Sequence, residues 1–362
     1  MTTSQHAFSW WRYLLLGHIE PFRGDVQFED PENAERSFAS HYQTHIQPFV
    51  EQFEAKRIEA LKSMRKRILI AVPLGFVLTL VGLFIINIFA LLIPVGLGAW
   101  AWWPCHTYKQ SVKEDIFRNV FSFFGDDYTY MPDGGVPAHY FQPSGILPKY
   151  DSAQMEDGIV GSHKGVKIEM VEAHLKDRRQ TTNSDGKTST KYVTVFKGML
   201  IALSMNKPFQ GHTVIRQDNG AFGNWLNKSS RLETVRLEDP VFEKAFEVYS
   251  SDQVEARYLL TTSFMERLLN LKQLMVDDKS FSLLSFLGGV LKGWNSGTIN
   301  GLQASFYEEK LLLMIPSNKN RFEISSMLYP ATFEQDINAI LKEMSTIFQI
   351  IELLKLDQNT RL

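Results

Sequence analysis

The pattern of apolar and polar residues divides the chain into a long uncharged stretch, two amphipathic helices and a region of alternating strands. From Ile68 to Trp103, 36 residues run without an Asp, Glu, Lys or Arg. As one helix this stretch would be roughly 54 Å long, against a bilayer hydrocarbon core of about 30 Å. Two short spans that meet at the polar Asn87 agree better with this length. We therefore predict a transmembrane helical hairpin with spans near 68–86 and 88–103.

Basic residues lie directly on both sides of this stretch, and tryptophans mark its second end. These membrane-flanking residues are Arg65, Lys66, Arg67, Trp102, Trp103 and Lys109. Lys and Arg near span ends stay on the cytoplasmic side, and tryptophans concentrate at membrane interfaces. Both termini are therefore expected to be cytoplasmic. A re-entrant hairpin that enters and leaves on one side is the alternative topology.

Amphipathic helices are predicted on both sides of the hairpin. Apolar residues recur at three- and four-residue steps over residues 32–64, with a kink expected at Pro48. This helix either packs on its own domain or forms a coiled-coil arm for a partner. A wider apolar stripe predicts a second helix near 333–356, which begins at a capping box of Thr332 and Gln335.

The region before the last helix carries the alternation that is typical of strands. Residues 193–205 alternate apolar with smaller or polar side chains, and residues 302–315 predict a β-hairpin. A helical stretch that Ser251 or Asp252 could cap lies between them. Strands, a helix, strands again and a final helix imply an α+β fold with a largely antiparallel sheet. The expected parts are an N-terminal cytoplasmic amphipathic region (1–67), the transmembrane hairpin (68–104), a membrane-proximal helix and connector (105–150), the α+β domain (151–331) and a C-terminal amphipathic helix (332–362).

Composition narrows the function classes only slightly. With 38 basic and 40 acidic residues the formal net charge is -2, so no overall field attracts nucleic acid. The single cysteine, Cys105, excludes an intrachain disulfide and a cysteine-based zinc cluster. It lies at the end of the apolar stretch, where it is either a small boundary residue or a site of acylation.

Three segments carry a resemblance to a known family. The segment from Leu237 to Leu269 resembles the signature region of the bacterial domain-of-unknown-function family 3137. Gly145–Gly165 resembles the family's entry segment, and Thr194–Leu203 its central strand. The resemblance implies a bacterial protein of the inner membrane with two spans and a cytoplasmic domain. It implies no reaction, so no catalytic residue is transferred.

Two polar groups of the α+β domain are candidates for chemistry. Glu172 and His174 lie on one face of an expected strand, where a zinc site or two solvent-facing side chains are the competing interpretations. If they served an enzyme, they should converge in one concave site. A second cluster, which a phosphate at a helix start or ordinary capping would explain, consists of Ser251, Asp252, Glu255 and Arg257. No phosphate loop, nucleophile elbow or zinc-protease motif occurs, so no catalytic residue, cofactor or metal is assigned.

Two further segments bear on the membrane surface. Residues 176–191 carry five basic side chains and are expected to form a solvated loop or a contact with anionic lipid. Residues 281–294 form the most apolar piece outside the spans and would either lie in the membrane interface or cover the sheet.

Three functional hypotheses follow from these features. The first is a non-enzymatic, membrane-anchored cytoplasmic interaction or scaffold module that self-associates or binds a protein partner. The second is an enzyme acting on lipid or a membrane-bound substrate. The third is an accessory subunit of a membrane transport complex, against which the lack of any charge within the spans argues. The expected partners are the lipid bilayer and a protein or second copy, and no nucleic acid.

Overall fold

The computed structural model describes residues 9–19, 26–30, 37–85, 87–136, 138–182, 188–205, 209–217, 232–277, 301–317, 331 and 333–354. The chain forms two compact units, one of Met1–Phe124 with Phe322–Lys342 and one of Gly125–Arg321 with Glu343–Leu362. Thr332 and the apolar segment 281–294 lie outside the described residues.

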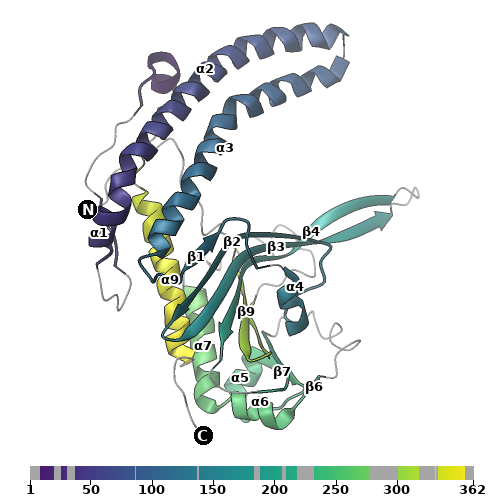
Figure 1. Cartoon of the computed structure of the whole chain (residues 1–362). Helices are drawn as coiled ribbons and strands as arrows, with labels where there is room; N and C mark the ends of the chain where they lie inside the picture. Colours follow the sequence, from purple (N-terminus) through teal and green to yellow (C-terminus); the bar gives the residue numbers. More distant parts are fainter. Residues whose placement is uncertain are drawn as a thin grey trace. The chain divides into compact units, whose positions relative to one another are not determined.

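The described part of the first unit is helical. Its elements are η1 (Arg12–Leu16), α1 (Phe38–His41), η2 (Tyr42–Ile46), α2 (Gln47–Ile85), η3 (Asn87–Leu91) and α3 (Leu92–Phe121). The predicted kink at Pro48 coincides with the change from η2 to α2, and the predicted break at Asn87 is the start of η3. Figure 1 shows α2 and α3 running side by side. Pro73 lies inside α2 without ending it.

The charged half of α2 has its own core. Phe38, Leu61 and Phe117 are fully buried. Arg57 is buried as well, and its Nε and Nη2 donate to Glu54 over 2.8 and 2.7 Å. The apolar face of the described part of this segment, residues 37–64, is therefore packed within its own unit, as the first of the two interpretations of this helix expects.

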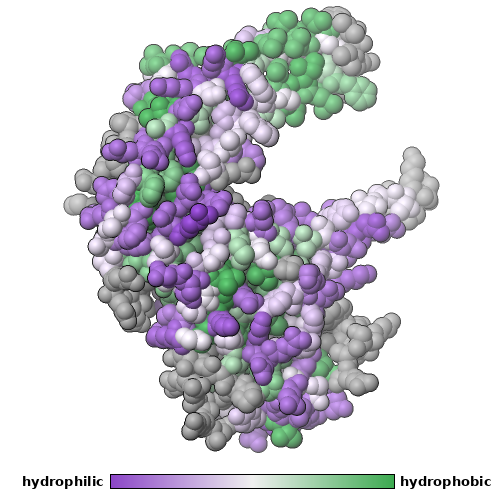
Figure 2. All heavy atoms as spheres, in the orientation of Figure 1, coloured by the Kyte–Doolittle hydropathy of each residue, from purple (hydrophilic) through white to green (hydrophobic). Residues whose placement is uncertain are grey.

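The uncharged part of the two helices has a different surface. From Leu69 to Leu83, most large apolar side chains of α2 are exposed, and Figure 2 shows the resulting hydrophobic surface at that end of the helices. Among the described residues, one helix, within Phe38–Leu83, is long and apolar enough to cross a membrane. The uncharged part of α3 (Leu92–Tyr108) is shorter, about 25 Å, because η3 takes up several residues of the apolar stretch. The two-span topology therefore stays a prediction.

The second unit is built on an antiparallel nine-stranded sheet with the order β1-β2-β3-β4-β9-β8-β5-β7-β6. The strands are β1 (Thr129–Met131), β2 (Ser152–His163), β3 (Val166–Thr182), β4 (Thr188–Ser204), β5 (Thr213–Gln217), β6 (Glu233–Thr234), β7 (Phe246–Ser250), β8 (Gln303–Tyr307) and β9 (Lys310–Pro316). The structure thus confirms the α+β class with an antiparallel sheet, and β8 and β9 form the predicted hairpin.

Short helices complete the second unit. They are α4 (Ala138–Phe141), η4 (Gln142–Ser144), α5 (Pro240–Ala245), α6 (Gln253–Leu259) and α7 (Thr262–Asp277). Phe141, Ile146 and Leu147 from the segment before β2 pack against one face of β3, β4 and β9. This face of β3 consists of the odd-numbered Val171, Ala173 and Leu175, as the two-residue period of a strand requires.

The last helix, α9 (Glu334–Leu354), spans the division between the units at Lys342 and Glu343. Its apolar stripe is buried, as Ile337, Leu341 and Ile351 are each at most 1% exposed. Within the second unit, the Glu352 carboxylate forms an ion pair with the Lys164 ammonium group over 2.5 Å. Phe348 stacks on His163 with ring centres 4.0 Å apart. The predicted C-terminal amphipathic helix is therefore a packed element of the fold.

The expected loop at 176–191 is mostly sheet. β3 continues to Thr182 and β4 begins at Thr188, with pairs from Lys176↔Thr194 to Thr182↔Thr188. Figure 1 shows this end of the hairpin projecting beyond the rest of the sheet. The sequence suggested a loop because these strands have no continuous apolar face to bury.

Candidate functional site

A polar hollow lies on the face of β3 opposite the apolar core. Glu172 and His174 line it together with Glu156 and Gln154 of β2 and Lys197 of β4. Pairing explains this grouping, because Glu156 is the register partner of Glu172, and His174 pairs with both Gln154 and Lys197. Glu172 and His174, which the sequence singled out, thus lie together in one polar hollow.

A β-bulge fixes the edge of this hollow. The register between β2 and β3 shifts between Glu156 and Ile159, and Asp157 in the shift has a positive φ of 54°. Asp157 is buried and accepts a hydrogen bond of 2.5 Å from the Tyr130 hydroxyl of β1. Gly158 is required beside it, because a Cβ there would lie 1.9 Å from the carbonyl oxygen of Gly134. Bulges re-aim side chains next to functional sites.

Charge within the hollow is mixed. Glu156 and Glu172 lie directly opposite each other, an arrangement of like charges that destabilises a sheet. Gln154 offsets part of this by donating to Glu156 over 2.6 Å. Burial, together with Lys176 and Lys197, lowers the pKa of His174 below its ordinary value. The same burial favours the neutral form of His174, whose Nε2 lies 2.8 Å from the Thr194 hydroxyl.

The size and ligand set of the hollow limit its chemistry. Its volume is about 190 Å³, below the roughly 300 Å³ at which small-molecule pockets begin. Within the described part of the chain, no group of three or more His, Cys, Asp or Glu side chains is arranged to hold a metal ion. The volume of this hollow is too small for a large cofactor.

The second polar cluster of Ser251, Asp252, Glu255 and Arg257, called the serine cluster below, makes contacts within the local fold. Asp252 caps α6 by accepting from the amides of Val254 and Glu255. The Glu255 carboxylate accepts from the amides of Gln210 and Gly211 over 2.8 and 2.5 Å. These bonds account for the acidic members of the cluster as capping groups and loop ties.

The remaining members of this cluster make similar local contacts. Ser251 Oγ accepts from the His212 amide, and Arg257 donates to the carbonyl of Gln253. None of the four residues of the serine cluster lines the polar hollow.

The membrane-flanking residues lie where the charged and uncharged parts of α2 and α3 meet. Arg67 donates to the Trp100 carbonyl over 2.9 Å and its guanidinium lies 5.1 Å from the centre of the Trp100 ring. Arg65 donates to the carbonyls of Leu14 and Leu15 within η1. These contacts of Arg65 and Arg67 were not predicted, because they depend on how the helices pair.

The other flanking side chains face outward. Trp102 and Trp103 are 51% and 61% exposed, and Lys66 is exposed too. Lys109 is half-buried. Cys105 is buried with its thiol 3.2 Å from the Met64 sulfur, which supports its interpretation as a packed boundary residue.

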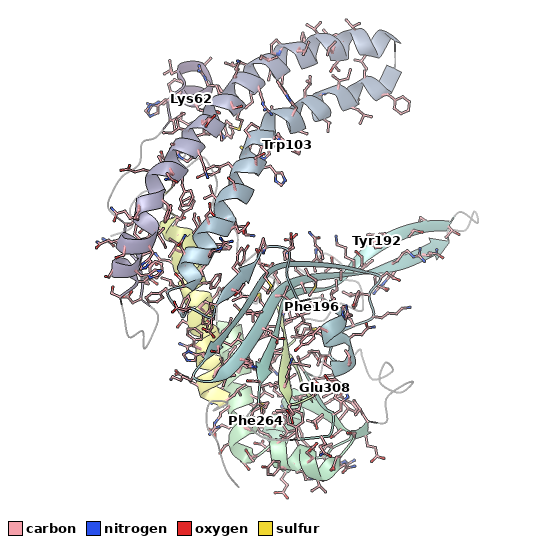
Figure 3. The ribbon with its side chains drawn as sticks, viewed as in Figure 1. Lys62, Trp103, Tyr192, Phe196, Phe264 and Glu308 are labelled. Atoms are coloured by element: carbon pink, nitrogen blue, oxygen red, sulfur yellow. The ribbon has the colours of Figure 1, made fainter. Side chains whose placement is uncertain are left out.

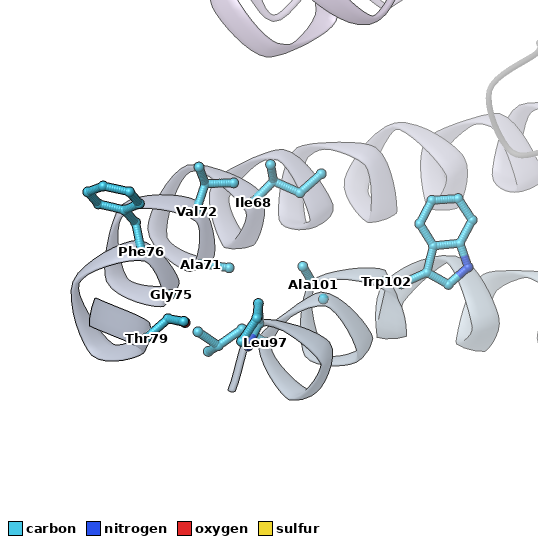
Figure 4. Close-up of a pocket in the computed structure, with 11 residues that line it drawn as sticks. Ile68, Ala71, Val72, Gly75, Phe76, Thr79, Leu97, Ala101 and Trp102 are labelled. Atoms are coloured by element: carbon cyan, nitrogen blue, oxygen red, sulfur yellow. The ribbon is translucent and has the colours of Figure 1, made fainter. Parts of the chain in front are cut away.

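An apolar groove of about 510 Å³ separates α2 and α3 beyond this boundary. Ala71 and Gly75 of α2 face Leu97 and Ala101 of α3 across it (Figure 4). A Cβ on Gly75 would lie 3.2 Å from Leu97 Cδ1, so the small residue allows the helices to approach. Small residues at such positions are typical of helix pairs in membranes.

The sequence brought Glu172 and His174 together but did not place Glu156, Gln154 or Lys197 beside them. The signal that could have found them is register, because these three residues lie 16 to 23 positions from their partners. Without the bulge position, the facing residue on β2 is not defined.

These features define an α+β protein, and its described residues include one helix that is long and apolar enough to cross a membrane. Residues 194–288 and 292–356 match the model of the family described as "Protein of unknown function (DUF3137)". This match confirms the resemblance of Thr194–Leu203 and Leu237–Leu269 to the family, whereas Gly145–Gly165 lies outside the matched residues. No curated protein matches the chain.

One solved structure is similar to the chain, the crystal structure of the mycobacterial trehalose monomycolate transport factor A, TtfA. Its sequence identity is 8% and the TM-score is 0.29, over 68% of this chain and 94% of that chain. A TM-score this low does not establish a shared fold.

Proposed function

We propose that this protein is a membrane-anchored interaction or scaffold module of the bacterial inner membrane. Its helical hairpin crosses the bilayer twice and leaves both termini in the cytoplasm. The α+β unit then presents a sheet to a protein partner or a second copy. In this proposal the bilayer positions the module and the soluble unit makes the specific contacts.

The observation that carries the proposal is the surface of α2. Val72, Phe76 and Val77 are each more than half exposed. An apolar patch of this kind on a soluble monomer promotes aggregation, whereas lipid tails cover it without cost. Basic and tryptophan residues collect at its inner boundary, where the positive-inside rule and the aromatic belt expect them.

Cysteine accessibility tests the topology. In a Cys105→Ser background, single cysteines replace Asn87 at the hairpin turn or Lys62 on the flanking helix. A membrane-impermeant maleimide added to intact spheroplasts is expected to label the Asn87→Cys variant alone, and the Lys62→Cys variant only after lysis. Labelling of neither site before lysis would indicate a re-entrant hairpin. Recovery of the chain in the soluble fraction without detergent would refute the anchor.

Self-association is tested separately. Full-length protein in detergent is expected to give dimers or larger species by light scattering, or to elute with a defined partner. A strictly monomeric particle without a partner, in both detergent and nanodiscs, would contradict the scaffold hypothesis.

The polar hollow favours an enzyme acting on lipid or a membrane-bound substrate as the second candidate. Glu172 and Glu156 supply carboxylates, and a neutral His174 could accept a proton. Overproduction of the wild type is then expected to change the lipid profile of the cell. The Glu172→Gln variant, produced at the same level, should not change it. Equal profiles from both proteins would refute this candidate.

A further inference from the structure

The end of the β3–β4 hairpin is paired differently from the rest of the sheet. β2 accompanies β3 only as far as Lys176, and β9 accompanies β4 only from Gly198 onward. Beyond these points the described parts of β3 and β4 pair with each other, and the Arg178 amide also donates to the Asp151 carboxylate over 2.7 Å. We call Lys176–Thr182 and Thr188–Thr194 the basic ribbon.

The composition of the basic ribbon is not that of a packed element. Apart from Val193 and Tyr192 its residues are polar or charged, and Figure 2 shows white and purple along its length. A two-stranded hairpin alone is at best marginally stable in water. A ribbon of this kind gains most from a surface that it can lie on.

The two faces of the basic ribbon carry different charges. On one face Asp177 forms an ion pair with Arg179 over 3.5 Å, and Lys191 lies opposite Arg179. On the other face the charged residues, Lys176 and Arg178, are both basic, because strand residues alternate between faces. Tyr192, which is 55% exposed, pairs with Arg178 on this second face (Figure 3).

We propose that the Tyr192 face of the basic ribbon lies on an anionic phospholipid surface, a contact that rests on the membrane anchor proposed above. Tyrosine is favoured at the headgroup level of membranes. Lys176 and Arg178 supply charges that attract anionic headgroups. The same face also carries hydrogen-bond donors, which are Gln180, Thr182, Thr188 and Thr190.

Two other surfaces fit this face less well. Nucleic-acid binding commonly neutralises six to ten phosphates, far more than two basic residues on one face can reach. A second copy of the ribbon would bring like charges together at Arg178. Anionic lipid needs neither a sequence-specific site nor an exact register.

A fluorescent label at the Tyr192 position tests the contact in the full-length chain. In the Cys105→Ser background, Tyr192→Cys carries an environment-sensitive dye, and Val254→Cys on α6, where the native side chain is 78% exposed, carries the same dye as the control. The protein is placed in nanodiscs of phosphatidylcholine, or of phosphatidylcholine mixed with phosphatidylglycerol. We expect a blue shift and protection from aqueous iodide at position 192 in the anionic discs only. High salt should reverse the blue shift and the protection, because it screens the attraction between the basic residues and the anionic headgroups.

Removal of the two basic charges measures how much they contribute to docking on anionic lipid. Each basic residue near anionic lipid changes the docked-to-undocked ratio about fivefold, so the Lys176→Gln and Arg178→Gln pair should lower it roughly 25-fold. An equal signal in both lipids, or equal shifts at both labels, would overturn the proposal. A shift in neutral discs that grows with protein density would also overturn it, in favour of contact between copies. A chain that stays outside the discs refutes the anchor itself, and this inference with it.

Discussion

Replacement of Arg57 by methionine is the sharpest test of how the first unit is held together. Arg57 is 0% exposed and donates twice to the Glu54 carboxylate, which also accepts from the Ala331 amide over 3.0 Å. Tyr108 is buried nearby, and desolvation raises its pKa well above the ordinary value. The Arg57→Met variant keeps the volume of the side chain and removes only its charge and donors.

The expected loss of unfolding free energy follows from the burial. Removal of one partner of a buried ion pair leaves the other charge uncompensated and costs about 3–5 kcal/mol. Addition of Glu54→Gln should recover most of this loss, because no buried charge remains while the acceptor for the Ala331 amide is kept.

The assay is urea unfolding of the full-length protein in one detergent, followed by circular dichroism. The matched control is Arg118→Met, because Arg118 pairs with Glu114 over a similar 2.7 Å with side chains 71% and 50% exposed. An exposed pair of this kind contributes at most about 1 kcal/mol. Equal losses from Arg57→Met and Arg118→Met would refute the role assigned to burial.

Three further predictions concern single positions. Gly198→Val should destabilise the sheet by about 3 kcal/mol or more in urea titration, because a Cβ there would lie 2.1 Å from the Ile315 carbonyl oxygen; an unchanged midpoint would contradict this. Burial lowers the pKa of His212 below its ordinary 6.5, so the unfolded chain binds the proton more readily and stability should fall as pH drops below about 6.5. His212→Gln should reduce that slope, and equal slopes would contradict the assignment. Gly82→Leu should lower the thermal midpoint in detergent, because its Cβ would lie 2.8 Å from Ala90 Cβ; an unchanged midpoint would show that the helices are not packed there.

The sequence predicted those parts of the fold that local chemistry determines. Asp252 caps α6, as its side chain suggests, and β8 and β9 form the hairpin expected at 302–315. The apolar Val254 of α6 is 78% exposed, because α6 has only seven residues and too few turns to define an apolar stripe.

Non-local pairing accounts for what the sequence did not predict. The polar hollow depends on a bulge after Glu156 that sets which side chain faces Glu172. A one-residue shift in register would move Glu156 to the other face of the sheet. Nothing in the local sequence determines that choice.

Strand β3 connects the two polar features of the second unit. Its even-numbered positions change from the buried Ile168 and Met170 to Glu172 and His174 in the hollow, and then to the basic ribbon. Alternation therefore places the hollow and the Tyr192 face on the same side of the sheet. An enzyme would need both features, because the ribbon would bring headgroups to the side on which a 190 Å³ hollow lies. A scaffold would need only the ribbon, so Glu172→Gln should leave docking and partner binding unchanged in a scaffold and abolish turnover in an enzyme.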